Sequence, residues 1–265
     1  MIRTGRSRPE RGGLHISASA IRTIQECPRD WFYRYVEGRP PEDVPPRLVL
    51  GVAMHEALAT FYSAMRDGED LPAPEALAVI TASSIDRAAA AGSPIGFDDD
   101  ESVETLKEQA NGLLVAFMAN GYRPQRVLAV EEPFALALSD PDTGEVLPYE
   151  ERVVGAIDLV AEEDGRVVIV DHKTAARSDK QKGERADTQM AFYAWAAKQV
   201  LGEHEVKLRY QSVIKTKVPK VEVQTIALRK HDEREAVEAA AGAIELIHVA
   251  VAHPNGKRLM SRRRS

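Results

Sequence analysis

The stretch RVVGAIDLVAEEDGRVVIVDHKT, residues 152–174, contains two apolar, strand-like runs joined by Asp164 and Gly165. An Asp-Gly pair favours a two-residue hairpin turn, because both central residues of that turn need a positive φ. Such a turn pairs residue 163 with residue 166 and, counting back, places Asp158 directly opposite Asp171. A four-residue loop would keep both carboxylates on one face, whereas a three-residue loop would separate them. The stretch therefore predicts antiparallel strands with two opposed aspartates.

Charged residues gather at the open end of this hairpin. Lys173 follows Asp171 by two residues, so its side chain projects from the same face. Two nearby carboxylates repel, and a hard divalent cation such as Mg²⁺, which takes oxygen ligands, removes that repulsion. The lysine could then support an attacking water or neutralise charge on a phosphate. The alternative is a buried Asp–Lys ion pair that only closes the strand, and the apolar flanks do not separate the two interpretations.

Composition limits the class of protein. The chain has 265 residues, 44% of them hydrophobic, which suits one elaborated domain or two small ones, and we favour the first. It has no apolar run typical of a signal peptide or a membrane span, so we expect a soluble, cytoplasmic protein without membrane contact, in a bacterial or phage-infected cell. The net charge of -6 argues mildly against a protein that coats nucleic acid.

Periodicity and turn residues divide the chain into a helical half, a sheet and a last helix. We expect a single domain over 14–255, between a basic leader, 1–13, and a basic tail, 256–265. The predicted parts of the domain are a mainly helical region, 14–125, with an irregular helical insertion at 66–100, a catalytic sheet, 126–230, and a C-terminal helix, 231–255. This order predicts an α/β fold in which helices flank a mixed central sheet.

Asp158 and the triplet Asp171-His172-Lys173 resemble the signature of the PD-(D/E)XK nuclease superfamily, in which an acidic residue on one strand precedes acid-x-Lys on the next. Other motifs resemble the RecB-like exonuclease branch of that superfamily. They are GAID at 155–158, VDHKT at 170–174, Gln189 and Tyr193 in DTQMAFYAW, His55 in GVAMHEALATFY, and the N-terminal SASAIRTIQECPRDWFYRYV. The resemblance spans most of the chain and implies a restriction-endonuclease-like core with an N-terminal helical region.

The resemblance also implies roles for these residues. The implied ligands of Mg²⁺ or Mn²⁺ are Asp158, Asp171, the imidazole of His55 and the backbone carbonyl of His172. Lys173 would position or activate the attacking water. Gln189 and Tyr193 lie four apart on a helix, so they share a face and would hold Lys173 and a substrate phosphate. Together with the two aspartates, these three residues form the predicted catalytic set.

Several of these residues also have purely structural interpretations. Tyr193 alone would suggest a packing aromatic, Gln189 a surface amide, and His55 a satisfied core or surface group. His55-Glu56 does not begin a zinc-peptidase motif, since residue 59 is alanine. On the strand before the hairpin, Glu131 and Glu132 are further candidates for the metal side of the site.

The chain departs from some relatives in its cysteines. Exonucleases of CRISPR adaptation and certain helicase–nuclease subunits resemble it at Cys27-Pro28 but carry three further cysteines near the C-terminus, and the four hold an iron–sulfur cluster. HPNGKRLMSRRRS occupies that place here, so no iron–sulfur cluster is expected. The sequence also lacks GxxxxGK[ST], so no ATP site is expected and any helicase would act in trans.

These features favour a metal-dependent deoxyribonuclease, an exonuclease acting on single-stranded or duplex DNA ends in recombination, repair or phage DNA metabolism. The alternatives are a nuclease-fold protein that binds DNA or a recombination partner without cutting, and an endonuclease. The segment CPRDWFYRYVEGR, residues 27–39, could line a strand channel by stacking on Trp31 or Tyr33, or it could pack Phe32 and its neighbours into the core.

Overall fold

The computed structural model describes residues 15–176, 186–202, 205–229 and 231–252, and at its centre lies one mixed β-sheet. The strands are β1 (His15–Ile16), β2 (Arg126–Ala137), β3 (Arg152–Glu163), β4 (Arg166–Ala175), β5 (Lys207–Ile214) and β6 (Lys220–Ile226). Their order is β1-β3-β4-β5-β6, and β2 also pairs with β3. The pairs β1–β3 and β4–β5 are parallel and the others antiparallel. This confirms the predicted α/β class with a mixed sheet.

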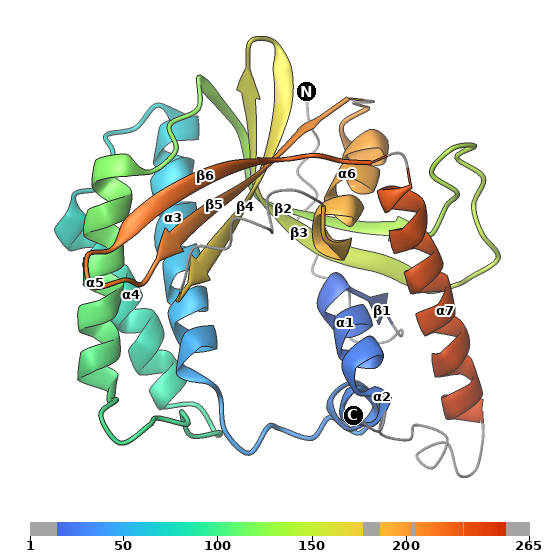
Figure 1. The fold of residues 1–265 in the computed structure, drawn as a ribbon, viewed down its shortest axis with the longest axis horizontal. Helices are drawn as coiled ribbons and strands as arrows, with labels where there is room; N and C mark the ends of the chain where they lie inside the picture. The colour runs from blue at the N-terminus through green and yellow to red at the C-terminus, as the bar shows by residue number, and fades with distance from the viewer. Residues whose placement is uncertain (1–14, 177–185, 203–204, 230, 253–265) are drawn as a thin grey trace.

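Helices cover both faces of the sheet (Figure 1). They are α1 (Ala18–Glu26), α2 (Pro28–Trp31), the π-helix η1 (Phe32–Val36), α3 (Pro46–Asp67), α4 (Pro74–Ala89), α5 (Val103–Asn120), α6 (Thr188–Val200) and α7 (Asp232–Ala252). One core lies under α3, α4 and α5, and the other under α1, α6 and α7. Alternation along β4 supplies both, since Val168 and Val170 join the first core while Val167 and Ile169 join the second.

The hairpin between β3 and β4 has the predicted register. Asp164 and Gly165 adopt φ values of 51° and 71°, as a two-residue turn with two left-handed positions requires. The paired residues run from Glu163 with Arg166 to Leu159 with Val170. The ladder ends there, so Asp158 and Asp171 occupy the first position at which the two strands diverge.

Two expectations for the helical half need correction. The insertion at 66–100 is not irregular throughout, because α4 forms 16 regular residues within it and buries Leu77 and Ile85. Stacking of a base on Trp31 is wrong for this structure, because its side chain is 1% exposed in the core that includes Ile21 and Ile24. The predicted leader and tail lie outside the described residues.

The helix α3 is long and apolar enough, by length and composition alone, to cross a membrane. Half of its most apolar window is nevertheless buried inside the fold. It packs against α4, α5 and strands β2 to β4, and Phe61 and Tyr62 are fully buried there. These contacts account for the apolar character of α3 as a core helix.

Gly155 allows β2, β3 and α6 to meet closely. A Cβ at this position would lie 2.6 Å from Cζ and 2.8 Å from Cε1 of Phe134. Phe134 is buried on β2 and packs edge-on against Tyr193 of α6, with ring centroids 6.3 Å apart. Because residue 155 has no side chain, the ring of Phe134 can lie directly against β3, and Tyr193, which packs on that ring, lies close to the sheet.

We expect Gly155→Ala to destabilise the protein by about 1–3 kcal/mol, because the added methyl group overlaps the confined ring of Phe134. Gly242→Ala is the matched control. Gly242 lies in α7 with nothing within 4 Å of an added Cβ. Alanine there should stabilise the helix by about 0.5–1 kcal/mol. Urea unfolding measures both changes, and equal stabilities of the two variants would contradict the close packing at Gly155.

Candidate active site

Three acidic residues from neighbouring strands lie at one level of the sheet. The pairs Val130–Leu159 and Glu132–Ile157 place Glu131 opposite Asp158, although the ladder is interrupted there. Glu131 has a φ of 48°, a left-handed backbone that is uncommon for a residue other than glycine. Asp158 in turn occupies the position opposite Asp171. The interruption of both ladders therefore coincides with the carboxylates, as strained positions often do at functional sites.

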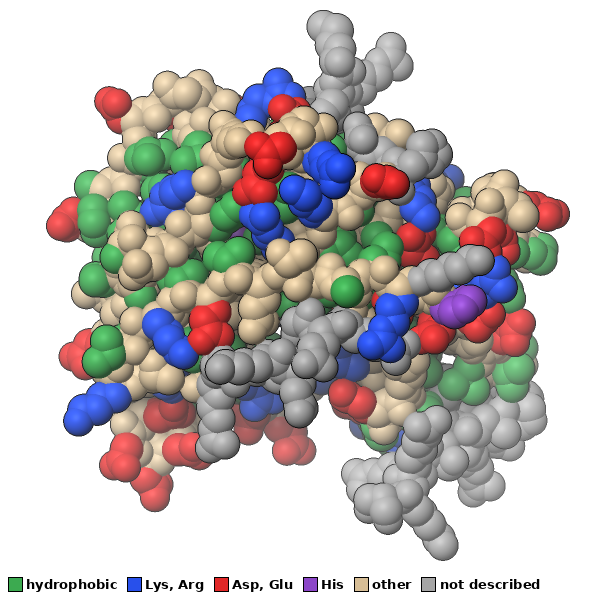
Figure 2. Space-filling model, turned by 45° about the horizontal axis from the view of Figure 1, so that its top comes forward, with side chains coloured by type: hydrophobic (Ala, Val, Ile, Leu, Met, Phe, Trp, Pro, Cys, Tyr) green, Lys and Arg blue, Asp and Glu red, His purple; other side chains and the backbone are tan. Residues whose placement is uncertain are grey.

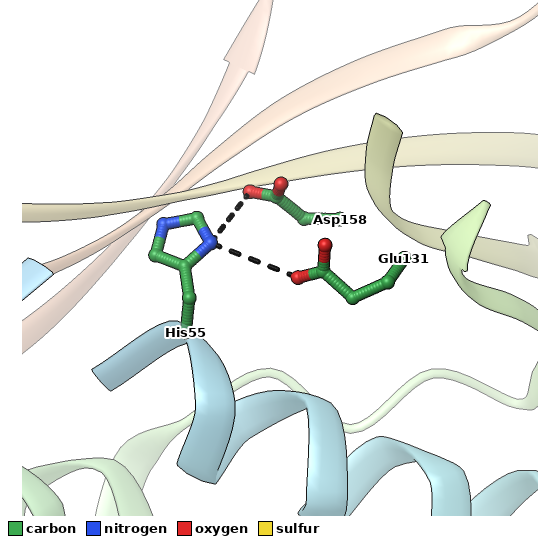
Figure 3. Close-up of side chains that lie close together, drawn as sticks. All are labelled: His55, Glu131 and Asp158. Atoms are coloured by element: carbon green, nitrogen blue, oxygen red, sulfur yellow. Dashed lines mark ion pairs between the residues drawn. The ribbon is translucent and has the colours of Figure 1, made fainter. Parts of the chain in front are cut away.

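His55 reaches these carboxylates from α3 (Figure 3). Its Nδ1 lies 3.6 Å from Asp158 Oδ2 and 3.8 Å from Glu131 Oε1. Ligand atoms of His55, Glu131 and Asp158 all lie within 4.8 Å of one another, and we call these three residues the ligand cluster. Among the described residues this is the one group of three such side chains compact enough for a single ion.

His172 connects this cluster to the opposite face of the sheet. Its backbone N–H donates to Asp158 Oδ2 at 2.7 Å, and its carbonyl accepts from His55 Nε2 at 2.9 Å. Its imidazole points away, stacks on Tyr62 with centroids 5.3 Å apart, and lies 3.1 Å from the amide nitrogen of Gln211. Burial, with the charges of His55 and Lys173, lowers the pKa of His172 to about 3, so this ring is neutral.

Lys173 lies at the centre of a chain of polar contacts. Its Nζ is 2.6 Å from Asp171 Oδ2 and donates to Gln189 Oε1 at 3.0 Å. The amide of Gln189 in turn donates to the hydroxyl of Tyr193 at 2.7 Å. Gln189 and Tyr193 thus lie together on one face of α6, with Gln189 in contact with Lys173, and their roles in catalysis stay a prediction. The ammonium is held between a fully buried carboxylate and an amide fixed by its own partner.

Burial opposes the negative charges of the site. It raises the pKa of Asp158 to about 7, assisted by repulsion from Asp171, while the charge of His55 and the His172 N–H lower it. Burial likewise raises the pKa of Asp171, although Lys173 opposes that shift. Burial lowers the pKa of His55, but Glu131, Asp158 and Asp171 together outweigh it and raise that pKa to about 9. The carboxylates therefore favour a positive charge close by.

This arrangement fits a divalent cation. The two carboxylates of the ligand cluster are donors that suit Mg²⁺ and Mn²⁺, whereas its imidazole nitrogen is a donor that suits softer transition metals. Asp171 adds Oδ1, a buried oxygen with no hydrogen-bond partner in the described part of the chain. A cation bound at this place would satisfy that oxygen and separate the two aspartates.

Not all acidic candidates occupy equivalent places. Glu131 joins the compact group, whereas Asp171 lies beside it, held by Lys173. Glu132 belongs to neither, and its charge acts on Arg66 near the end of α3. Sequence analysis did not single out Gln211, because one glutamine in the apolar strand YQSVI gives no sign that it will meet a histidine.

The fold and this site together define a restriction-endonuclease-like α/β domain with an acid-x-Lys centre. The family model described as the PD-(D/E)XK nuclease superfamily matches residues 15–257. The chain belongs to this superfamily, whose members are nucleases and typically use divalent metals.

One of the solved structures compared with this chain supports the fold. A protein of Eubacterium rectale, provisionally named an exonuclease, matches with a TM-score of 0.55 at 13% identity, over 93% of this chain and 82% of its own. Another structure matches at a TM-score of 0.30 and 11% identity, over 90% and 95% of the two chains. A protein of Vibrio cholerae matches at 0.22 and 13%, over 85% and 52%. A comparison with curated proteins found no match.

The raised pKa of His55 predicts how stability depends on pH without metal. The folded protein keeps this proton up to about pH 9, whereas an unfolded histidine releases it near pH 6.5. The resulting stability is complete below about pH 6.5 and is lost as the pH rises toward 9. We expect the Tm of the metal-free protein to fall across this window, and His55→Gln to flatten the fall. Thermal melts of the unmodified protein and the His55→Gln variant test this.

A bound metal ion should oppose this fall in Tm with rising pH. The imidazole of His55 must lose its proton to bind the metal, so the metal binds more tightly at higher pH. The rise in Tm caused by a fixed Mn²⁺ concentration should therefore be larger near pH 8.5 than near pH 6.5. An equal rise at both pH values, or a full rise in His55→Gln, would place the metal elsewhere.

Proposed function

We propose that this protein is a metal-dependent deoxyribonuclease of the RecB-like branch, which hydrolyses phosphodiester bonds at DNA ends. The observation that carries the proposal is the position of Lys173 beside the ligand cluster, 2.6 Å from Asp171 and 3.0 Å from Gln189. Contacts on two sides hold the ammonium in one place. Such fixed positioning is what a group acting on a reacting phosphate requires.

The residues that would hold Mg²⁺ or Mn²⁺ are the ligand cluster and Asp171, next to the carbonyl of His172. When bound, the cation neutralises phosphate charge and makes water a better nucleophile. Lys173 orients the attacking water or donates to a phosphate oxygen, and stabilises negative charge that develops there. Gln189 keeps the ammonium in position, and Tyr193 holds Gln189.

Two other functions compete with this proposal. A nuclease-fold protein could bind DNA or a recombination partner without cutting, but such a protein would have no use for a buried Asp171 whose Oδ1 has no partner in the described chain. An endonuclease would use the same centre and differ in the substrate it admits. The name of the Eubacterium rectale protein supports the choice of an exonuclease.

DNA, as a single strand or a duplex end, is the proposed substrate. Acidic and basic side chains are interspersed on the face shown in Figure 2, and the net charge of the chain is -6. Binding of DNA would therefore depend more on positive charge at the site, from the metal ion and Lys173, than on a broad basic surface. We place this activity in recombination, repair or phage DNA metabolism in the cytoplasm. Because the sequence has no Walker motif, any helicase or recombinase coupled to it would act in trans.

Cleavage of end-labelled linear DNA and closed circular DNA in Mg²⁺ or Mn²⁺ tests the proposal. We expect the linear substrate to be shortened from its ends and the circle to stay intact. Asp171→Ala and Lys173→Ala should each reduce the rate by about 10²–10⁴-fold, because one removes a carboxylate of the metal site and the other the fixed ammonium. EDTA should abolish activity.

Lys220→Ala is the matched control, since Lys220 lies on the edge strand β6 in an ion pair with Glu222. It should retain the rate of the unmodified protein. An unmodified protein that degrades neither substrate would refute the enzymatic function. Discrete cuts in the circle would indicate an endonuclease, and full activity in both site variants would refute the assignment of residues.

A further inference from the structure

A hollow of about 700 Å³ opens beside the ligand cluster. Its lining includes His55, Glu131, His172 and Lys173, so it is continuous with the site described above. One wall is the face of α3 that also carries His55, and it contributes Leu48, Gly51, Val52 and Ala59, with Arg47 at one end. The hollow therefore joins a charged floor to a largely apolar helical wall.

The wall of this hollow is apolar surface that the fold leaves bare. Leu48 and Val52 are 54% and 57% exposed, while their neighbours Val49 and Ala53 are buried in the core. Single exposed apolar residues need no explanation, but these two lie four apart and so form one patch on consecutive turns. Gly51 lies between them, and nothing is within 4 Å of the place where its Cβ would be. We call Leu48, Gly51 and Val52 the α3 shelf.

The α3 shelf lies at a nucleotide's distance from the metal-binding groups. Val52 precedes His55 by three residues and Leu48 by seven, which corresponds to about 4.5 and 10.5 Å along the helix axis. A phosphate at the ligand cluster would therefore bring its own or the adjacent base against the shelf.

Charges around the shelf suit the backbone of the same nucleotide. Arg47 is exposed at one end and forms no ion pair with another described residue, and Lys173 lies at the floor. Glu56, the acidic residue on the rim, is neutralised by Arg87 at 2.5 Å. Cations for phosphates combined with an apolar surface for a base are the chemistry of single-strand binding. In a duplex both faces of a base are covered by stacking, so only an unstacked base can use the shelf.

We propose that the α3 shelf receives the unstacked base next to the scissile phosphate, and that this protein therefore prefers single strands or frayed ends to intact duplex. This inference rests on the proposed function and specifies its substrate. Because the shelf acts by contact with this base, it should contribute nothing to kcat/KM on a substrate that lacks the base.

A cycle between protein and substrate tests the contact. The substrates are single-stranded oligonucleotides, intact or with one abasic site beside the cleaved bond. With unmodified protein, we expect the abasic site to lower kcat/KM about five- to tenfold, as loss of a partly buried apolar contact would. The double variant Leu48→Ser/Val52→Ser should show the same loss on intact DNA and no further loss on the abasic strand. If the abasic site and the double variant lower kcat/KM by factors that multiply when the two are combined, the proposal is overturned.

Gly51→Leu provides a second variant that acts by filling the hollow. It improves the helix propensity of α3, so weaker cleavage by this variant would not result from unfolding. We expect a similar five- to tenfold loss on single strands. Val115→Ser is the matched control, because Val115 is also 57% exposed on a helix, α5, outside the hollow. Unchanged single-strand cleavage by Gly51→Leu would overturn the shelf.

Failure of the shelf and failure of the nuclease function are separable. Fluorescence anisotropy measures binding of the same oligonucleotides to Lys173→Ala protein, with and without the shelf substitutions, and needs no cleavage. A protein that cleaves but shows no coupling between shelf and base refutes the shelf alone. A protein that does not cleave refutes the proposed function, while the anisotropy result still decides the shelf. Equal affinity for single strands and blunt duplex would refute the proposed preference.

Discussion

The burial of Asp171 beside Asp158 is the constraint on which the rest of this structure depends. A buried carboxylate is costly, and Asp171 is 1% exposed with Lys173 as its ion-pair partner. It is held there by five apolar-rich residue pairs of the β3–β4 hairpin and by the pairing of β4 with β5 on the other side. The sheet is thus stable up to Val170, and that stability positions two charges that would otherwise move apart or into solvent.

The strand alternation at His172 links this constraint to the helical layer. Asp171 and Lys173 face α6, so His172 between them must face α3. Its neutral ring stacks on Tyr62, and Gln211 bonds both His172 and Tyr62. The backbone of the same residue contacts Asp158 and His55 on the side of the site. The contacts of His172 on β4 therefore set the distance between the sheet and α3, the helix that carries His55.

Features of the site that depend on residues close together in the sequence could be predicted, and features that depend on how distant strands pair could not. The β3–β4 register depends on the Asp164-Gly165 turn alone, and it was predicted correctly. The approach of Gln189 to Lys173 followed from helical spacing and resemblance. The place of Glu131 could not be derived, because it depends on a register shift in β2 between Val127 and Ala129 and on its own left-handed backbone. Neither feature has a signature in the sequence, and both arise when strands pair in three dimensions.

α3 has two apolar faces, which explains why its composition alone resembles that of a membrane-spanning helix. One face fills the core around Phe61, and the other carries the bare Leu48 and Val52 into the hollow that contains His55. A helix that serves both purposes must be apolar on more than one side, and this raises its hydropathy toward that of a membrane span. Under the proposed function, apolar contact between this bare face and a base would add affinity that the net charge of -6 opposes. The exposed Leu48 and Val52 therefore add to an apolar character that the core already requires of α3.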